Sequence, residues 1–228
     1  MPSESIPANH IDGNETHTRR HIAVVVGTWS VAIVAAFLLD ATVATFLHTH
    51  GIDQRVIDGG TLKHLAKLPG LFYGSTLPVA AALAIWHPRH WRAALFELLC
   101  GVIAGANAII KWLAGRTRPF KLPPLTIAQP FRFSYCAGGF RGLIHQSNDL
   151  SFVSGHTAVA FATAAGVAVL LPKHRAVICA AYAIALIVFC ERVLENAHWL
   201  SDATCAVAFS IGAVALLGRV WPVNRPVI

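Results

Sequence analysis

The sequence predicts an all-α integral membrane protein in which six transmembrane helices form one bundle. Apolar residues make up 55% of the chain and charged residues only 13%, against roughly 25% charged residues in a typical soluble domain. Apolar segments of about 20 residues, the length that crosses a bilayer core as a helix, recur along the chain. The few polar side chains could not cover a protein of this size in water, so we expect the apolar segments to contact lipid.

The predicted elements follow in order along the chain. The apolar segments lie near residues 22–39, 69–86, 93–110, 153–171, 175–190 and 199–217. One or two such segments could be buried helices of a soluble protein, but six favour membrane spans. Residues 1–20 are polar and are expected to form a disordered cytoplasmic tail. Residues 21–221 would then form one membrane domain, followed by a short cytoplasmic tail at 222–228.

Basic residues in the short connections predict the orientation in the membrane. Arg19 and Arg20 precede the first segment, basic residues occupy the connections at 87–92 and 172–175, and Arg219 follows the last segment. The positive-inside rule puts these pieces, and with them both chain ends, in the cytoplasm. The opposite face carries more basic residues in longer loops, and we interpret several of them as phosphate ligands. The expected location is a bacterial inner membrane, with the functional site facing the periplasm or the exterior.

Charge and cysteine usage argue against two other classes of protein. The net charge is +7, but the basic residues stand in short pieces between apolar segments. Nucleic-acid binding needs them clustered on one exposed face, so nucleic acid is not an expected partner. The five cysteines are scattered without a CxxC pair, which argues against a disulfide framework or a zinc site.

Three clusters of polar residues stand at the ends of apolar segments. They are Lys111 to Pro119, Ser154 to His156, and Arg192 with His198 and Asp202. Successive spans cross the membrane in alternate directions, so the third segment ends on the side where the fourth and sixth begin. Counting spans therefore predicts that the three clusters share one membrane face.

The residue types in these clusters suit an anion such as phosphate. Lys111, Arg118 and Arg192 are cations that could surround a phosphate, and the two arginines could bind it through paired hydrogen bonds. Ser154 and Gly155 would open a helix, whose free N–H groups and dipole favour an anion. Each residue taken alone could instead anchor or cap a helix. Their convergence on one face favours the anion site.

Two histidines and an aspartate suggest covalent catalysis. His198 and Asp202 are spaced i, i+4, so the carboxylate could accept a hydrogen bond from one ring nitrogen and leave the other free to attack. His156 is suited to protonate the leaving oxygen. A purely structural pair is the alternative. Two further acids, Asp40 and Glu97, lie near the ends of apolar segments and are expected to reach the membrane interface.

The three clusters resemble the signature of the type-2 phosphatidic acid phosphatase superfamily. Its K-x6-R-P motif is matched from Lys111 to Pro119, its P-S-G-H motif from Ser154 to His156, and its S-R-x5-H-x3-D motif from Arg192 to Asp202. The order and the internal spacing agree, and the resemblance covers about residues 22–218.

The chain departs from this signature at two positions. Val153 stands where the family usually has proline, a residue that shapes the turn into the helix. Glu191 stands where the family usually has serine. The added carboxylate could pair with Arg192 and weaken its binding of phosphate.

The resemblance implies a six-helix fold and hydrolysis of a phosphomonoester or diphosphate through a phosphohistidine intermediate, with no cofactor and no metal. The implied phosphate ligands are Lys111, Arg118, Ser154, Gly155 and Arg192. His198 would be the nucleophile, Asp202 would orient it, and His156 would donate the proton.

The function expected from this reading is that of a lipid phosphatase in the bilayer. Undecaprenyl diphosphate, phosphatidic acid, phosphatidylglycerophosphate and lipid A-type phosphates are all compatible substrates. A catalytically weak lipid-phosphate binding protein or transporter of the same fold is the main alternative. A vanadate-binding haloperoxidase is a third possibility, but those relatives are soluble.

Overall fold

The computed structural model describes residues 9–123, 131–136, 139 and 150–223. Its helices, in chain order, are α1 (Asn9–Thr49), α2 (Ile52–Ile57), α3 (Gly60–Lys67), the 3-10 turn η1 (Leu68–Gly70), α4 (Thr76–Trp86), α5 (His90–Gly105), α6 (Asn107–Ala114), η2 (Pro119–Lys121), α9 (Gly155–Leu170), α10 (Arg175–Leu194) and α11 (Leu200–Val220). Within the described residues the only β pairing is an isolated bridge, so the all-helical class is confirmed.

Four helical stretches are long and apolar enough to cross a membrane. They are Ile22–Thr49, His90–Ala114, Arg175–Leu194 and Leu200–Val220. The other two expected spans form shorter apolar helices, α4 and α9. At about 1.5 Å rise per residue, the 11 residues of α4 cover roughly half of a bilayer core of about 30 Å. The six-span arrangement therefore stays a prediction.

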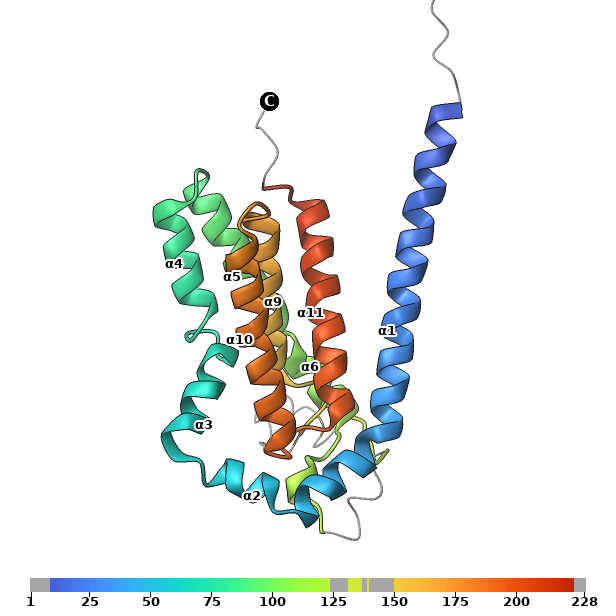
Figure 1. Ribbon diagram of the computed structural model, residues 1–228, viewed down its shortest axis with the longest axis vertical. Helices are drawn as coiled ribbons and strands as arrows, with labels where there is room; N and C mark the ends of the chain where they lie inside the picture. The colour runs from blue at the N-terminus through green and yellow to red at the C-terminus, as the bar shows by residue number, and fades with distance from the viewer. Residues whose placement is uncertain (1–8, 124–130, 137–138, 140–149, 224–228) are drawn as a thin grey trace, which may run out of the picture.

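Helix α9 lies at the centre of the bundle (Figure 1). It packs against α5, α10 and α11, while α4 packs on α5 and α1 packs on α11. Most residues of α9 are buried, and its core positions are largely alanine, glycine and threonine. Small side chains let neighbouring helices approach closely, which is the usual basis of helix packing in membranes. The sequence of α9 thus explains its central position.

The second apolar segment differs most from the prediction, because its first part does not continue into α4. Residues 68–70 form η1, and α4 begins only at Thr76. The chain turns sharply between them. A Cβ atom on Gly74 would lie 1.9 Å from the carbonyl oxygen of Leu68, so only glycine fits there. Pro69 also removes a backbone donor from a continuous helix.

Two helices, α2 and α3, were not expected from the apolar pattern. They run along one end of the bundle and connect α1 with η1 (Figure 1). α1 begins at Asn9, inside the segment expected to be a disordered tail. Residues 1–8 of that tail and residues 224–228 of the expected C-terminal tail lie outside the described residues.

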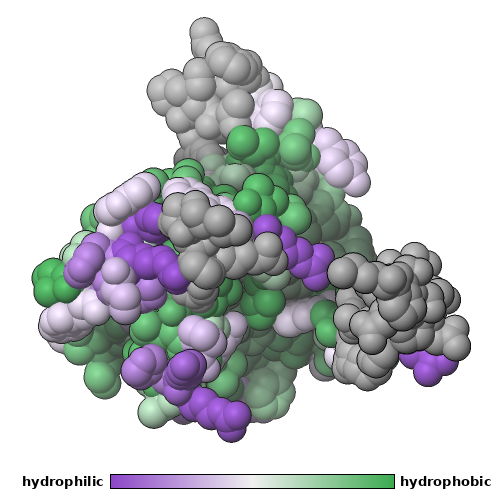
Figure 2. All heavy atoms as spheres, turned by 90° about the horizontal axis from the view of Figure 1, so that it is seen from above, coloured by the Kyte–Doolittle hydropathy of each residue, from purple (hydrophilic) through white to green (hydrophobic). Residues whose placement is uncertain are grey.

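The two ends of the bundle differ in content. α1 begins and α11 ends at the same end, where the α4–α5 and α9–α10 connections also lie (Figure 1). In the view from above, hydrophilic residues gather on this end face and hydrophobic residues cover the flanks (Figure 2). The opposite end holds α6, the end of α10 and the start of α11, and so brings the three polar clusters together.

Candidate active site

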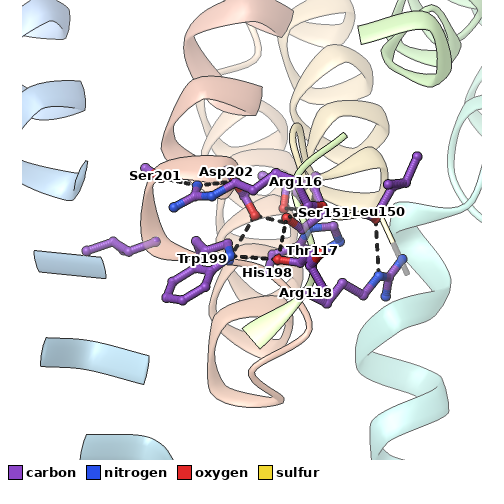
Figure 3. Close-up of polar contacts among 12 residues, drawn as sticks. Arg116, Thr117, Arg118, Leu150, Ser151, His198, Trp199, Ser201 and Asp202 are labelled. Carbon is purple, nitrogen blue, oxygen red and sulfur yellow. Dashed lines mark hydrogen bonds and ion pairs between the residues drawn. The ribbon is translucent and has the colours of Figure 1, made fainter. Parts of the chain in front are cut away.

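Backbone hydrogen bonds join the three sequence clusters (Figure 3). Thr117 and Leu150 form the isolated antiparallel bridge. The N–H of Ser151 donates to the carbonyl of Arg116 at 2.7 Å, and the N–H of Ser154 donates to the carbonyl of Asp202 at 3.2 Å. These bonds tie the chain after α6, the chain before α9 and the first turn of α11 to one another. Side chains distant in sequence therefore meet at one place.

His198 is enclosed, and a backbone carbonyl sets the orientation of its ring. The residue is 1% exposed, and its Nδ1 atom lies 2.8 Å from the carbonyl oxygen of Ser151. Because a carbonyl can only accept, Nδ1 carries the proton and Nε2 keeps its lone pair. Oδ2 of Asp202 lies 3.8 Å from Nδ1, beyond hydrogen-bond length. The expected hydrogen bond from His198 to Asp202 is thus replaced by one to Ser151.

The carboxylate of Asp202 is already engaged by other donors. Its Oδ2 atom accepts the N–H of Trp199 at 3.0 Å, which caps the start of α11. Its Oδ1 atom accepts from Nη1 of Arg116 at 2.5 Å. The residue is fully buried. In this arrangement Asp202 acts on the His198 ring through its charge and not through a direct hydrogen bond.

The N-terminus of α9 faces the site with unused donors. The N–H groups of Gly155 and His156 have no hydrogen-bond partner in the described part of the chain, whereas that of Ser154 is used. Free N–H groups at a helix start favour an anion. A Cβ atom on Gly155 would lie 2.8 Å from Nδ2 of Asn107, so any larger residue here would displace the Asn107 side chain. Nε2 of His156 is buried and also lacks a partner among the described residues.

Two cations of the first cluster border the His198 ring. Lys111, in the last turn of α6, makes no hydrogen bond or ion pair with any residue that the structure describes. Arg118 donates from Nε to the carbonyl of Leu150 at 3.2 Å. Burial, and then the charges of Lys111, Arg118 and Arg192, hold the pKa of His198 well below its usual 6.5. The ring is therefore neutral at neutral pH, as a nucleophile must be.

Arg192, the third cation, is paired with two carboxylates. Its Nε and Nη2 atoms donate to both oxygens of Glu191, and Nη2 also donates to Glu195. Glu195 in turn accepts from Lys63 of α3 at 2.6 Å. Nη1 of Arg192 has no partner among the residues described. The pairing of Glu191 with Arg192 follows the expectation from sequence, but the participation of Glu195 and Lys63 does not.

Helix α3 and η1 form an unexpected wall of the site. A Cβ atom on Gly70 would lie 2.6 Å from Cβ of His156, so η1 packs directly on this histidine. Burial and the charge of Arg192 lower the pKa of Lys67, while Glu195 opposes the shift. Lys67 is thus close to the anion site. These residues lie outside the three clusters, and no motif in the sequence singles them out.

Two acids expected at the membrane interface are buried instead. Asp40 is 1% exposed and accepts from Nη2 of Arg116 at 2.7 Å. Glu97 is fully buried, and a Cβ atom on Gly166 would lie 2.2 Å from its Oε2 atom. The Thr163 hydroxyl lies close to the Glu97 carboxylate, but within the described residues no hydrogen bond of normal geometry reaches that carboxylate. Both side chains point into the bundle, where a short carboxylate cannot reach the interface.

The arrangement brings cations and free N–H groups together with two histidines. Lys111 and Arg118 bring positive charge to the His198 ring, and the start of α9 brings free N–H groups. Among the described residues, no three His, Cys, Asp or Glu side chains come together as a metal site.

Comparison with known proteins identifies a family for the region that contains the three clusters. The family model described as the PAP2 superfamily matches residues 89–226, more than half of the chain. No curated protein and no solved structure gives a match. The matched region contains all three clusters, whereas α1 to α4 precede it.

Proposed function

The chain belongs to the PAP2 superfamily, and on this premise we propose that it is a metal-independent phosphatase that removes phosphate from a membrane lipid. The observation that carries the proposal is the state of His198. Its Nδ1–H is held by the Ser151 carbonyl at 2.8 Å, which leaves the lone pair on Nε2, and the charges of Lys111 and Arg118 act on the ring. This is the arrangement that a phosphohistidine mechanism requires.

In the first step, Nε2 of His198 attacks phosphorus and the bond to the leaving oxygen breaks. His156 gives its proton to that oxygen. Lys111, Arg118 and the N–H groups of Gly155 and His156 stabilise the charge on the other phosphate oxygens. In the second step, a water attacks phosphorus and gives a proton to His156. The phosphorus–nitrogen bond breaks, and phosphate leaves.

An apolar groove next to the site supports a lipid substrate. The groove has a volume of about 550 Å³ and lies between α3 and α10. It is lined by Val56, Gly59, Leu62, Ala66, Ala183, Leu186, Ile187, Cys190 and Leu194, together with Lys63 and Glu191. Glu191 is paired with Arg192, so the groove adjoins the phosphate site at its polar end. A hydrocarbon chain in the groove would leave the phosphate within reach of the cations.

The membrane arrangement that we propose has six spans, with α4 and α9 as the two short ones. Both chain ends would lie in the cytoplasm, and the site would face the periplasm or the exterior. Cysteines introduced at His90 and Gln54 test this in a background without the exposed native cysteines. An impermeant reagent should label position 54 and not position 90 in intact cells. Equal labelling would contradict the orientation.

Activity is tested with purified protein and a panel of lipid phosphates. We expect hydrolysis to persist in EDTA, to be inhibited by vanadate, and to pass through an acid-labile, base-stable phosphoenzyme. Loss of activity on chelation, restored by added metal, would contradict the metal-free mechanism. Ala substitution of Arg118 should nearly abolish turnover, because its charge-assisted contacts strengthen as charge develops on the phosphate.

A second candidate function is that of a catalytically weak lipid-phosphate binding protein. The pairing of Arg192 with Glu191 and Glu195 favours it, because the two carboxylates offset a cation of the phosphate site. Saturable binding of lipid phosphate without turnover or phosphoenzyme would support this alternative.

A further inference from the structure

A chain of buried charges connects α1 with the active site. Asp40 of α1 accepts from Nη2 of Arg116 at 2.7 Å, and it also accepts the N–H and the hydroxyl of Ser201 at 2.8 and 2.5 Å. The residue is 1% exposed. α1 lies outside the region that the family model matches. The first helix thus reaches the start of α11 through a polar side chain.

Arg116 forms the middle of this chain. Its Nη1 atom donates to Oδ1 of Asp202 at 2.5 Å and to the Ser201 hydroxyl at 2.7 Å. Its guanidinium group also lies 4.8 Å from the ring centroid of Trp199 and 5.3 Å from that of Phe133. Aromatic faces on a buried cation hold it in one orientation. Arg116 therefore joins Asp40 to Asp202 in one fixed geometry, and Figure 3 shows it beside Ser201 and Asp202.

We propose that Asp40 is a positioning residue for the reaction at His198, acting through Arg116 and Asp202. The proposal rests on the phosphohistidine chemistry proposed above. Asp40 and Asp202 bond different nitrogens of one guanidinium group, so Asp40 offsets part of the Arg116 charge that would otherwise act on Asp202, and Oδ2 of Asp202 lies 3.8 Å from Nδ1 of His198. When Nε2 bonds to phosphorus while Nδ1 stays protonated, the ring becomes cationic. The negative charge of Asp202 that Arg116 does not offset then stabilises that cation.

Without Asp40 the balance changes. Arg116 would offset more of the charge of Asp202, and the ring cation would face less negative charge. A merely structural role is the competing explanation, in which Asp40 only ties α1 to α11. Buried ion pairs contribute little net stability compared with apolar packing. Apolar contacts alone could therefore hold α1 against α11, and stability does not explain why a second carboxylate binds Arg116.

The test is Asp40→Asn, which keeps the size of the side chain and removes its charge. Asp53→Asn is the matched control, because Asp53 is also buried and bonded to Asn196, but it does not contact Arg116 or Asp202. We expect phosphoenzyme formation from p-nitrophenyl phosphate to fall roughly ten- to a hundredfold in Asp40→Asn, by analogy with the loss of a carboxylate that orients a metal-bound histidine. KM should change little, since the phosphate ligands are untouched.

Two further readouts separate positioning from folding. The acid limb of kcat/KM should move to lower pH in Asp40→Asn, because loss of an anion disfavours the imidazolium. The same substitution in an Asp202→Asn background should cost little more, because both changes act on one group. Rates equal to those of Asp53→Asn, or costs that simply add with Asp202→Asn, would overturn the proposal.

The affinity for orthovanadate tests the role of Asp40 without requiring that the protein hydrolyse phosphate. Vanadate bonds to a histidine nitrogen as phosphorus would, and it needs no turnover. We expect its affinity to fall about tenfold in Asp40→Asn and to stay unchanged in Asp53→Asn. If the wild type hydrolyses no phosphate but this difference is found, positioning stands and the proposed hydrolysis fails. If the wild type hydrolyses lipid phosphates and both variants bind vanadate alike, positioning fails and hydrolysis stands.

Discussion

Replacing Glu191 with glutamine tests whether the carboxylates beside Arg192 oppose the binding of phosphate. Glu191 occupies the Nε–Nη2 edge of the guanidinium group, and Nη1 has no partner among the described residues. A phosphate could therefore bind at Nη1 while Glu191 remains in place. The Glu191 carboxylate would then repel the phosphate across the width of the guanidinium group.

The size of this repulsion follows from that geometry. Two unit charges about 8 Å apart repel by about 2 kcal/mol at an effective dielectric constant of about 20, and by about 0.5 kcal/mol in water. Removing the charge of Glu191 should lower KM for a lipid phosphate by between about twofold and thirtyfold. Arg192 is 2% exposed, so the upper part of this range is expected and added salt should reduce it only slightly.

The substitution leaves the fold little disturbed. Arg192 stays paired with Glu195, so no buried charge is left without a partner, which would cost about 3–5 kcal/mol. Steady-state kinetics with a lipid phosphate measure the effect, and Asp58→Asn removes an exposed charge of the same sign just after α2 as a control. Glu191→Ser should act in the same direction. A KM that stays unchanged or rises relative to the control would refute the reasoning.

Three further predictions concern the histidines and the groove. Burial and nearby cations lower the pKa of His198 below 6.5, so its reactive neutral form persists in mild acid. The acid limb of kcat/KM for p-nitrophenyl phosphate should therefore lie below pH 6.5. A limb at or above that value contradicts the assignment of His198 as nucleophile. His198→Ala should form no phosphoenzyme. His156→Ala should lose less activity on p-nitrophenyl phosphate than on an alkyl phosphate, since a good leaving group needs no acid. Equal losses on the two substrates would exclude the acid role of His156. Ala183→Trp should fill the groove and remove about two methylene contacts, roughly 1.6 kcal/mol, which raises KM for long-chain lipid phosphates about tenfold. Ala176→Trp, on the same helix outside the groove, is its control, and an equal effect of the two would exclude the groove.

The sequence by itself determined the class of the fold and the meeting of the three clusters. Hydropathy is a local property of each segment, and it predicted long apolar helices that the structure contains at Arg175–Leu194 and Leu200–Val220. Alternation of spans predicted that Lys111 and His198 would share one end of the bundle. The structure places both residues at one end, where backbone hydrogen bonds join the three clusters. The break before α4 was also signalled, by Pro69 and Gly74, but the apolar pattern outweighed it in the prediction.

Only the tertiary structure decided which atoms meet within the site. Spacing along α11 suggested a bond from His198 to Asp202, yet Ser151 takes that bond because the chain before α9 packs against the ring. Asp40 is separated from its partner Arg116 by 76 residues, and Glu195 is joined to Lys63 across α3 and α10. Hydrogen bonds of this kind depend on ångström-scale packing between segments remote in sequence. Periodicity and motif spacing describe each segment alone, so they carry no record of these partners.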